Sequence, residues 1–189
     1  MRYKIFIVAA MILFAKGAIG YNSQDNAQIS LRMQYWELTG GEELNDVRTV
    51  HFIKKANNHT YSFLMQDIKK DKFEANFANN FIKGFYDGLK TNRCNTSEIK
   101  TDSKHSTPFH QSIFTSECQS RNMSSVILLV DADPLNLYIF TYTTDQYPLT
   151  PELRNFIFAE LHSIIRICYE PKNLTLNNAL DNCYNIDLP

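Results

Sequence analysis

The fold is decided by residues 125–143, which read SVILLVDADPLNLYIFTYT. The unbroken apolar run at 126–130 predicts a central strand that is buried on both faces, preceded by a strand at 110–118. Asp131 through Pro134 form a turn. Residues 137–143 predict the next strand, whose alternation sets three aromatic rings on one face: Tyr138, Phe140 and Tyr142.

Three more extended segments lie nearer the N-terminus. Residues 28–36 alternate apolar and polar side chains, which predicts a half-buried strand that ends before Gly40-Gly41. Segments 48–55 and 60–67 flank Asn57-Asn58-His59, residues that tolerate turn geometry. These two segments therefore predict a hairpin.

Two segments have helical periodicity. Between residues 71 and 90 large apolar side chains recur every four positions, which predicts an amphipathic helix that covers the sheet: Phe73, Phe77, Phe81, Phe85 and Leu89. A second helix is predicted to begin with Thr150 as its cap and Pro151 at its first position, and to be stopped by Glu170-Pro171. Its inward face comprises Leu153, Phe156, Ile157, Leu161, Ile164, Ile165 and Cys168.

Together these elements predict an α+β fold of order βββαβββα. A single antiparallel sheet of about six strands is covered by two main helices. Residues 21–189 are expected to form one domain, because about 169 residues suit one core and no internal stretch resembles a linker. The Ser/Thr/Lys-rich segment 91–107 is interpreted as a long surface loop, and the tail at 174–183 as pinned by its cysteine.

Residues 1–20 have the features of a cleaved secretory signal. Arg2 and Lys4 precede an apolar run from Ile5 to Ala15, and Ala18 and Gly20 occupy the small-residue positions of a cleavage site after Gly20. The apolar run is too short for a membrane-spanning helix, so a secreted or periplasmic protein without a stable membrane anchor is expected. Cleavage leaves 16 basic against 20 acidic residues, a net charge of about −4, which disfavours nucleic-acid binding.

All four cysteines follow the signal, and an even number in an exported chain indicates disulfides. The favoured pairings are Cys94 with Cys118 and Cys168 with Cys183, because sequence neighbours can tie a loop or tail onto the adjoining element. No C-x-x-C pair is present, so no structural metal is predicted.

The segment Tyr138 to Thr143 and the following helix, with Phe156, Leu161, Ser163 and Ile164, resemble the PsbP-like group, which includes the DcrB-like exported proteins. This resemblance covers the element order and the segment 138–165. It implies a non-enzymatic accessory or adaptor domain. The chain differs from that group in having four cysteines and no lipid-attachment cysteine.

Familiar catalytic motifs are absent from the sequence, including G-x-S-x-G, H-E-x-x-H, the Walker A loop and the dinucleotide fingerprint. No cofactor, metal or catalytic residue is therefore assigned. Weaker candidates are a metal site at His105 and His110, and an acid–base or cation site at Asp131 and Asp133. His162, beside the apolar face of the second helix, is interpreted as structural.

The sequence thus favours a secreted or periplasmic non-enzymatic binding protein: an adaptor, an inhibitor or an immunity-type partner of another protein. Its expected contact surface combines the 91–107 loop with aromatic rings at Trp36, Tyr138 and Tyr142, although these rings alternatively pack under a helix. Two other classes remain open. One is a hydrolase that uses Asp131, Asp133 or His110, and the other is a carrier whose Phe73–Leu89 stripe borders a cavity for a small apolar ligand.

Overall fold

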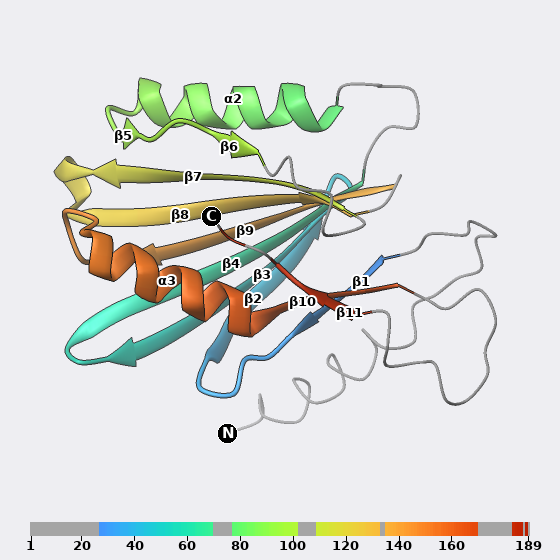
Figure 1. Cartoon of the computed structure of the whole chain (residues 1–189), viewed down its shortest axis with the longest axis horizontal. Helices are drawn as coiled ribbons and strands as arrows, with labels where there is room; N and C mark the ends of the chain where they lie inside the picture. The colour runs from blue at the N-terminus through green and yellow to red at the C-terminus, as the bar shows by residue number, and fades with distance from the viewer. Residues whose placement is uncertain are drawn as a thin grey trace.

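The computed structural model describes residues 27–69, 77–101, 109–132, 135–169, 183–186 and 188. Figure 1 shows the elements, which are, in chain order, β1 (Ala27–Leu31), β2 (Glu37–Leu44), β3 (Val47–Ala56), β4 (His59–Lys69), α2 (Phe77–Thr91), β5 (Asn95–Thr96), β6 (Lys100–Thr101), β7 (His110–Cys118), the 3-10 turn η1 (Gln119–Arg121), β8 (Met123–Asp131), β9 (Asn136–Thr144), α3 (Pro151–Ile164), β10 (Ile165–Tyr169) and β11 (Cys183–Asn185).

The strands form two antiparallel sheets. The large sheet has eight strands in the order β2-β3-β4-β9-β8-β7-β5, and β6 also pairs with β7. A small sheet has the order β1-β10-β11. The prediction of a single six-stranded sheet covered by two helices is therefore wrong. The large sheet has eight strands, and a second sheet of three strands helps to cover it.

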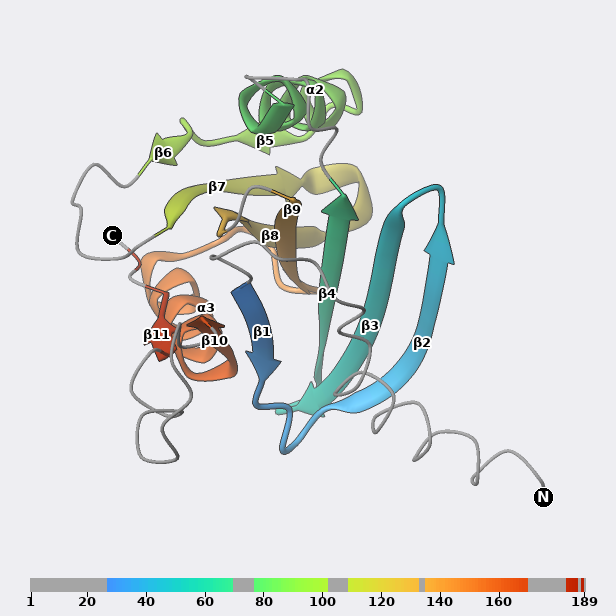
Figure 2. The same ribbon diagram turned by 90° about the vertical axis from the view of Figure 1, so that its right-hand side faces the viewer.

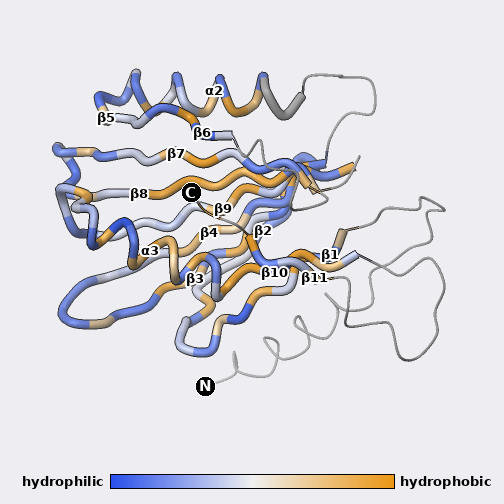
Figure 3. Tube along the Cα trace, in the orientation of Figure 1, coloured by the Kyte–Doolittle hydropathy of each residue, from blue (hydrophilic) through white to orange (hydrophobic). Residues whose placement is uncertain are grey.

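The large sheet curves, so that α3 and the small sheet lie on its concave side while α2 lies on its convex side (Figure 2). Alternate residues of β9 contact the two layers: Phe140 belongs to the concave core and Ile139 to the convex one. All residues from Val126 to Val130 are at most 1% exposed, which confirms the predicted central strand buried on both faces. Figure 3 shows the corresponding apolar band along β8.

Helix α2 contacts the convex face through the predicted stripe. Phe81, Ile82, Phe85, Tyr86 and Leu89 pack against a cluster that includes Phe114 and Leu129. The rings of Phe85 and Tyr86 lie 6.3 Å and 5.4 Å from the ring of Phe114. These side chains therefore form part of the core on the convex face. Phe73, the first residue of the predicted stripe, lies outside the described residues.

The second helix is shorter than predicted. Its start is confirmed, because Thr150 accepts a hydrogen bond from the backbone N–H of Leu153 and Pro151 follows the cap. It ends at Ile164, however, and the next five residues form β10, which pairs with β1. Because β-branched Ile165 and Ile167 fit a strand face, the pairing with β1 overrides the continuation of the helical pattern.

The N-terminal strand also differs from the prediction. Strand β1 ends at Leu31 and joins the small sheet, and Gly40-Gly41 lie within β2 instead of ending a strand. A register shift between Leu38 and Gly40 accommodates these glycines in the pairing with β3. The β3–β4 hairpin is confirmed, and Asn57 and Asn58 form its turn with φ values of 52° and 62°.

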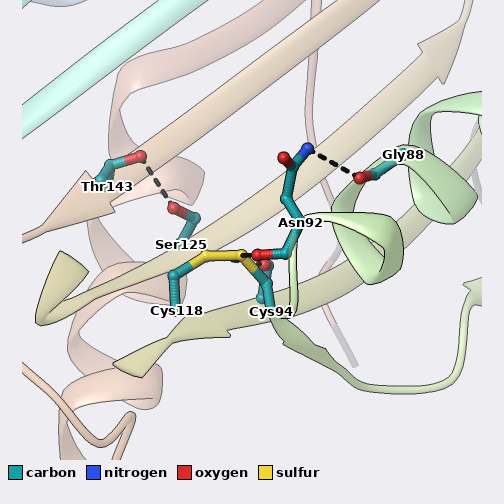
Figure 4. Close-up of a disulfide and its surroundings, with 7 residues drawn as sticks. Gly88, Asn92, Cys94, Cys118, Ser125 and Thr143 are labelled. Carbon is teal, nitrogen blue, oxygen red and sulfur yellow. Dashed lines mark hydrogen bonds between the residues drawn. A yellow bond between two sulfur atoms is a disulfide. The ribbon is translucent and has the colours of Figure 1, made fainter. Parts of the chain in front are cut away.

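Both predicted disulfide pairings are confirmed. Cys94–Cys118 fastens the segment that follows α2 to the end of β7, as Figure 4 shows, and Cys168–Cys183 joins β10 to β11. Beside the first bond, the Asn92 amide donates to the carbonyl of Gly88 and closes the end of α2. Within the segment predicted as a surface loop, 91–107, the described residues include β5 and β6.

Candidate binding surface

Trp36 lies between β1 and β2 and packs against the concave face of the large sheet. Its backbone N–H donates to the carbonyl of Met33 at 3.1 Å, which closes a tight turn just before β2. Its half-buried ring meets Phe63 and Tyr142 edge-on, with centroids 6.0 Å and 5.5 Å apart. The core therefore fixes the orientation of this indole while part of it stays accessible.

The other two predicted contact rings are not on the surface. Tyr138 is 4% exposed and Tyr142 is 0% exposed, so the expectation that they are exposed is wrong. Their face of β9 is covered by α3 and the small sheet, and the Tyr138 hydroxyl donates to the carbonyl of Ala27 at 3.4 Å. Of the three rings, only Trp36 remains available for a partner.

Lys54 joins Trp36 to helix α3. Its ammonium lies 2.5 Å from Oε2 of Glu160, and the two side chains are 15% and 25% exposed. The same ammonium lies 5.1 Å, 5.7 Å and 5.8 Å from the ring centroids of Trp36, Tyr61 and Phe156. These distances are within the range of cation–π attraction, so an ion pair and three rings hold one lysine in place.

Tyr142 lies in the same core, and its hydroxyl has no hydrogen-bond partner among the described residues. Burial, reinforced by the charge of Glu160 and by Tyr61, raises the pKa of Tyr142 above its ordinary value of 10.0. The hydroxyl of Tyr61, in contrast, has a partner, because it accepts a hydrogen bond of 3.0 Å from the Gln146 amide. The phenol of Tyr142 is therefore neutral throughout the physiological pH range.

We call Trp36, Lys54, Phe156 and Glu160 the Trp36 surface. Phe156 is 41% exposed although the helical pattern placed it in the core, and Tyr35, next to Trp36, is 77% exposed. Sequence reasoning missed Lys54 and Glu160, because they are 106 residues apart and no local pattern connects them. The arrangement offers a partner rigid apolar rings beside a charged pair.

The candidate hydrolytic residues are brought together only in part. His110 and Asp131 are direct partners in the β7–β8 register, at one end of the central strands. Asp133 and His105 lie outside the described residues. His162 donates a hydrogen bond of 2.7 Å from its Nδ1–H to the carbonyl of Ile186, which agrees with a structural role.

A polar network that the sequence did not reveal lies on the convex face near β2. His51 Nε2 is 2.8 Å from the Ser62 hydroxyl, and His51 Nδ1 is 3.0 Å from the Thr39 hydroxyl. Thr39 also donates to the His51 carbonyl at 3.2 Å. The bonds to Thr39 attach β2 to β3 at the position of its register shift, and the bond to Ser62 links β3 to β4.

In the part of the chain that the structure describes, no group of three or more His, Cys, Asp or Glu side chains is placed to hold a metal ion. Neither α2 nor α3, the helices of the described residues, has the length and apolar character needed to cross a membrane. Comparison with known proteins finds no matching family model and no similar curated protein. The two disulfides are consistent with an oxidising, secreted or periplasmic setting.

Proposed function

We propose that this chain is an exported, non-enzymatic binding or accessory protein that contacts another protein through the Trp36 surface. The observation that carries the proposal is that the Trp36 and Phe156 rings flank one ammonium, which Glu160 holds in place. Preorganised aromatic rings lose little entropy on binding and supply much of the energy of protein interfaces. The accessory role implied by the PsbP-like resemblance agrees with this proposal.

Export by a signal that is cleaved after Gly20 is part of the proposal. The disulfides support it, because such bonds persist in oxidising compartments. Intact mass and N-terminal sequencing of protein from its natural source test it directly. The expected N-terminus is Tyr21, and recovery of the chain with Met1 attached and four free thiols would overturn this part.

Site-specific photo-crosslinking in the natural source tests the interface. A photoreactive amino acid at Tyr35 or Phe156 should give one discrete adduct with a second protein, because both side chains are exposed. The same group at Lys83, on the exposed side of α2, is the matched control and should give none. If neither Tyr35 nor Phe156 gives an adduct in the compartment where the protein accumulates, the binding proposal fails.

A hydrolase is the second candidate, and the register that pairs His110 with Asp131 supports it. A histidine beside a carboxylate is a common arrangement for general-base chemistry. Release of p-nitrophenol from activated esters by the wild type, abolished in both His110→Ala and Asp131→Asn variants, would favour this class. Equal background rates in all three proteins would reject it.

A further inference from the structure

The two edges of the large sheet differ. Strand β2 forms one edge and, among the described residues, pairs with β3 alone. All eight of its residues except Leu38 are exposed. At the opposite edge, β5 and β6 have two residues each, both pair with β7, and Cys94–Cys118 fastens this segment. Short and covalently tied edge strands resist the addition of another strand, whereas a long exposed edge accepts it.

The backbone of β2 is suited to such pairing. Asn45 and Asp46 form the two-residue turn to β3, with φ values of 48° and 64°. Residues that flank a turn of this kind pair by hydrogen bonds, and alternate residues along an edge strand direct their N–H and C=O groups outward. Gly41 and Glu43 are therefore the outward positions. Gly41 has no side chain that would hinder an approaching chain.

The charge of β2 defines what would pair with it. The strand contains Glu37, Glu42 and Glu43 but no basic residue. Glu43 lies 3.4 Å from Arg48, while Glu37 and Glu42 have no ion-pair partner among the described residues. Both project from the same face, because their partners on β3, Ile53 and Thr49, are four residues apart. A second copy of this chain would bring carboxylates together, whereas a basic strand would neutralise them.

We propose that β2 is extended by a strand from another protein that carries Lys or Arg at alternate positions, facing Glu37 and Glu42. This inference rests on the proposed function, because β2 begins at the residue after Trp36. Main-chain hydrogen bonds would supply affinity, and the charges and the indole would supply selectivity.

Fluorescence anisotropy with a labelled peptide of alternating Lys and Val, about ten residues long, tests the proposal. Three matched probes are used: the basic peptide, the same peptide with Glu in place of Lys, and the basic peptide N-methylated at alternate residues. We expect the basic peptide to bind with a Kd below about 1 mM, and both changes to weaken binding at least about tenfold. Equal binding of the N-methylated peptide would overturn strand pairing.

Variants of the protein complete the test. The double variant Glu37→Lys/Glu42→Lys and the variant Gly41→Pro should each lose at least about tenfold in affinity for the basic peptide. Glu98→Lys, an exposed site near the opposite edge, should bind as the wild type does. Unchanged affinity in the double variant would overturn the proposal, and so would a wild-type dimer in sedimentation that Gly41→Pro dissociates. Near-UV circular dichroism identical to that of the wild type shows that each variant is folded.

The two proposals fail separately. A crosslinked partner at Tyr35 or Phe156 together with no peptide binding at β2 would leave the binding function standing and reject the strand addition. Absence of any crosslinked partner would reject the proposed function itself.

Discussion

Lys54 of β3 and Glu160 of α3 form the ion pair that holds the second helix against the concave face of the large sheet, with 2.5 Å between Nζ and Oε2. The pair is largely shielded, and the rings of Trp36, Tyr61 and Phe156 surround its ammonium. Its energy should therefore lie between that of an exposed pair and that of a buried one.

We expect Lys54→Met and Glu160→Gln each to lower the free energy of unfolding by about 1–3 kcal/mol, and the double variant to lose less than the sum. Each single change leaves one shielded charge without its partner, which explains the non-additivity. Urea titration of the four proteins measures the coupling. Lys69→Met, which removes an exposed pair with Asp46, is the control and should leave stability unchanged. Strict additivity would mean that the Lys54–Glu160 contact is not formed.

Replacing Tyr142 by Phe should leave stability unchanged or raise it by up to about 1 kcal/mol at neutral pH, because the buried hydroxyl has no partner among the described residues. Tyr61→Phe is the matched control, since it removes the hydrogen bond from Gln146 and should lower stability by about 1 kcal/mol. Thermal unfolding of both variants distinguishes the two hydroxyls.

Tyr142→Phe should also change how the free energy of unfolding declines at alkaline pH. The pKa of Tyr142 is raised in the folded protein, so above pH 10 the unfolded chain loses this proton while the folded protein keeps it. Rising pH therefore favours unfolding. The unfolding free energy of Tyr142→Phe should decline less steeply between pH 10 and the onset of denaturation than that of the wild type. Parallel curves would show that this phenol is accessible to solvent.

The two disulfides should differ in what their loss exposes. Cys94–Cys118 closes a loop of 24 residues and Cys168–Cys183 a loop of 15 residues. In the chain-entropy model, each bond stabilises the folded protein by about 3 kcal/mol. Cys94→Ser/Cys118→Ser should release β5 and open the edge of β7, so this variant should self-associate at high concentration. Cys168→Ser/Cys183→Ser should lose similar stability but self-associate less, because freeing β11 opens only the five-residue edge of β10, whereas β7 has nine residues. Light scattering compares the two, and equal scattering would refute the protective role of β5.

Local sequence signals predicted the centre of the fold. Strands β7, β8 and β9 follow from an apolar run and from alternation, and the Asn57-Asn58 turn follows from the tolerance of asparagine for positive φ. Alternation alone did not tell that both faces of β9 are covered, so Tyr142 was expected on the surface. Glu160 and Lys54 come together only through the tertiary fold, and no periodicity links them.

The most instructive error concerns the end of the second helix, and it leads to the last prediction. The helical pattern extended to Cys168 and left Ile167 off the inward face. In the structure Ile167 lies in β10, pairs with Ile29 and is 0% exposed. We therefore expect Ile167→Ala to destabilise the protein by about 2–5 kcal/mol, as for other large-to-small changes in a core. Arg154→Ala, on the exposed side of α3, is the control and should change stability by less than about 0.5 kcal/mol. If the helix instead continued to residue 169, Ile167 would lie off its inward face, and its replacement by Ala would change stability little. A small effect at this position would therefore restore the helical interpretation and contradict the small sheet on the concave side.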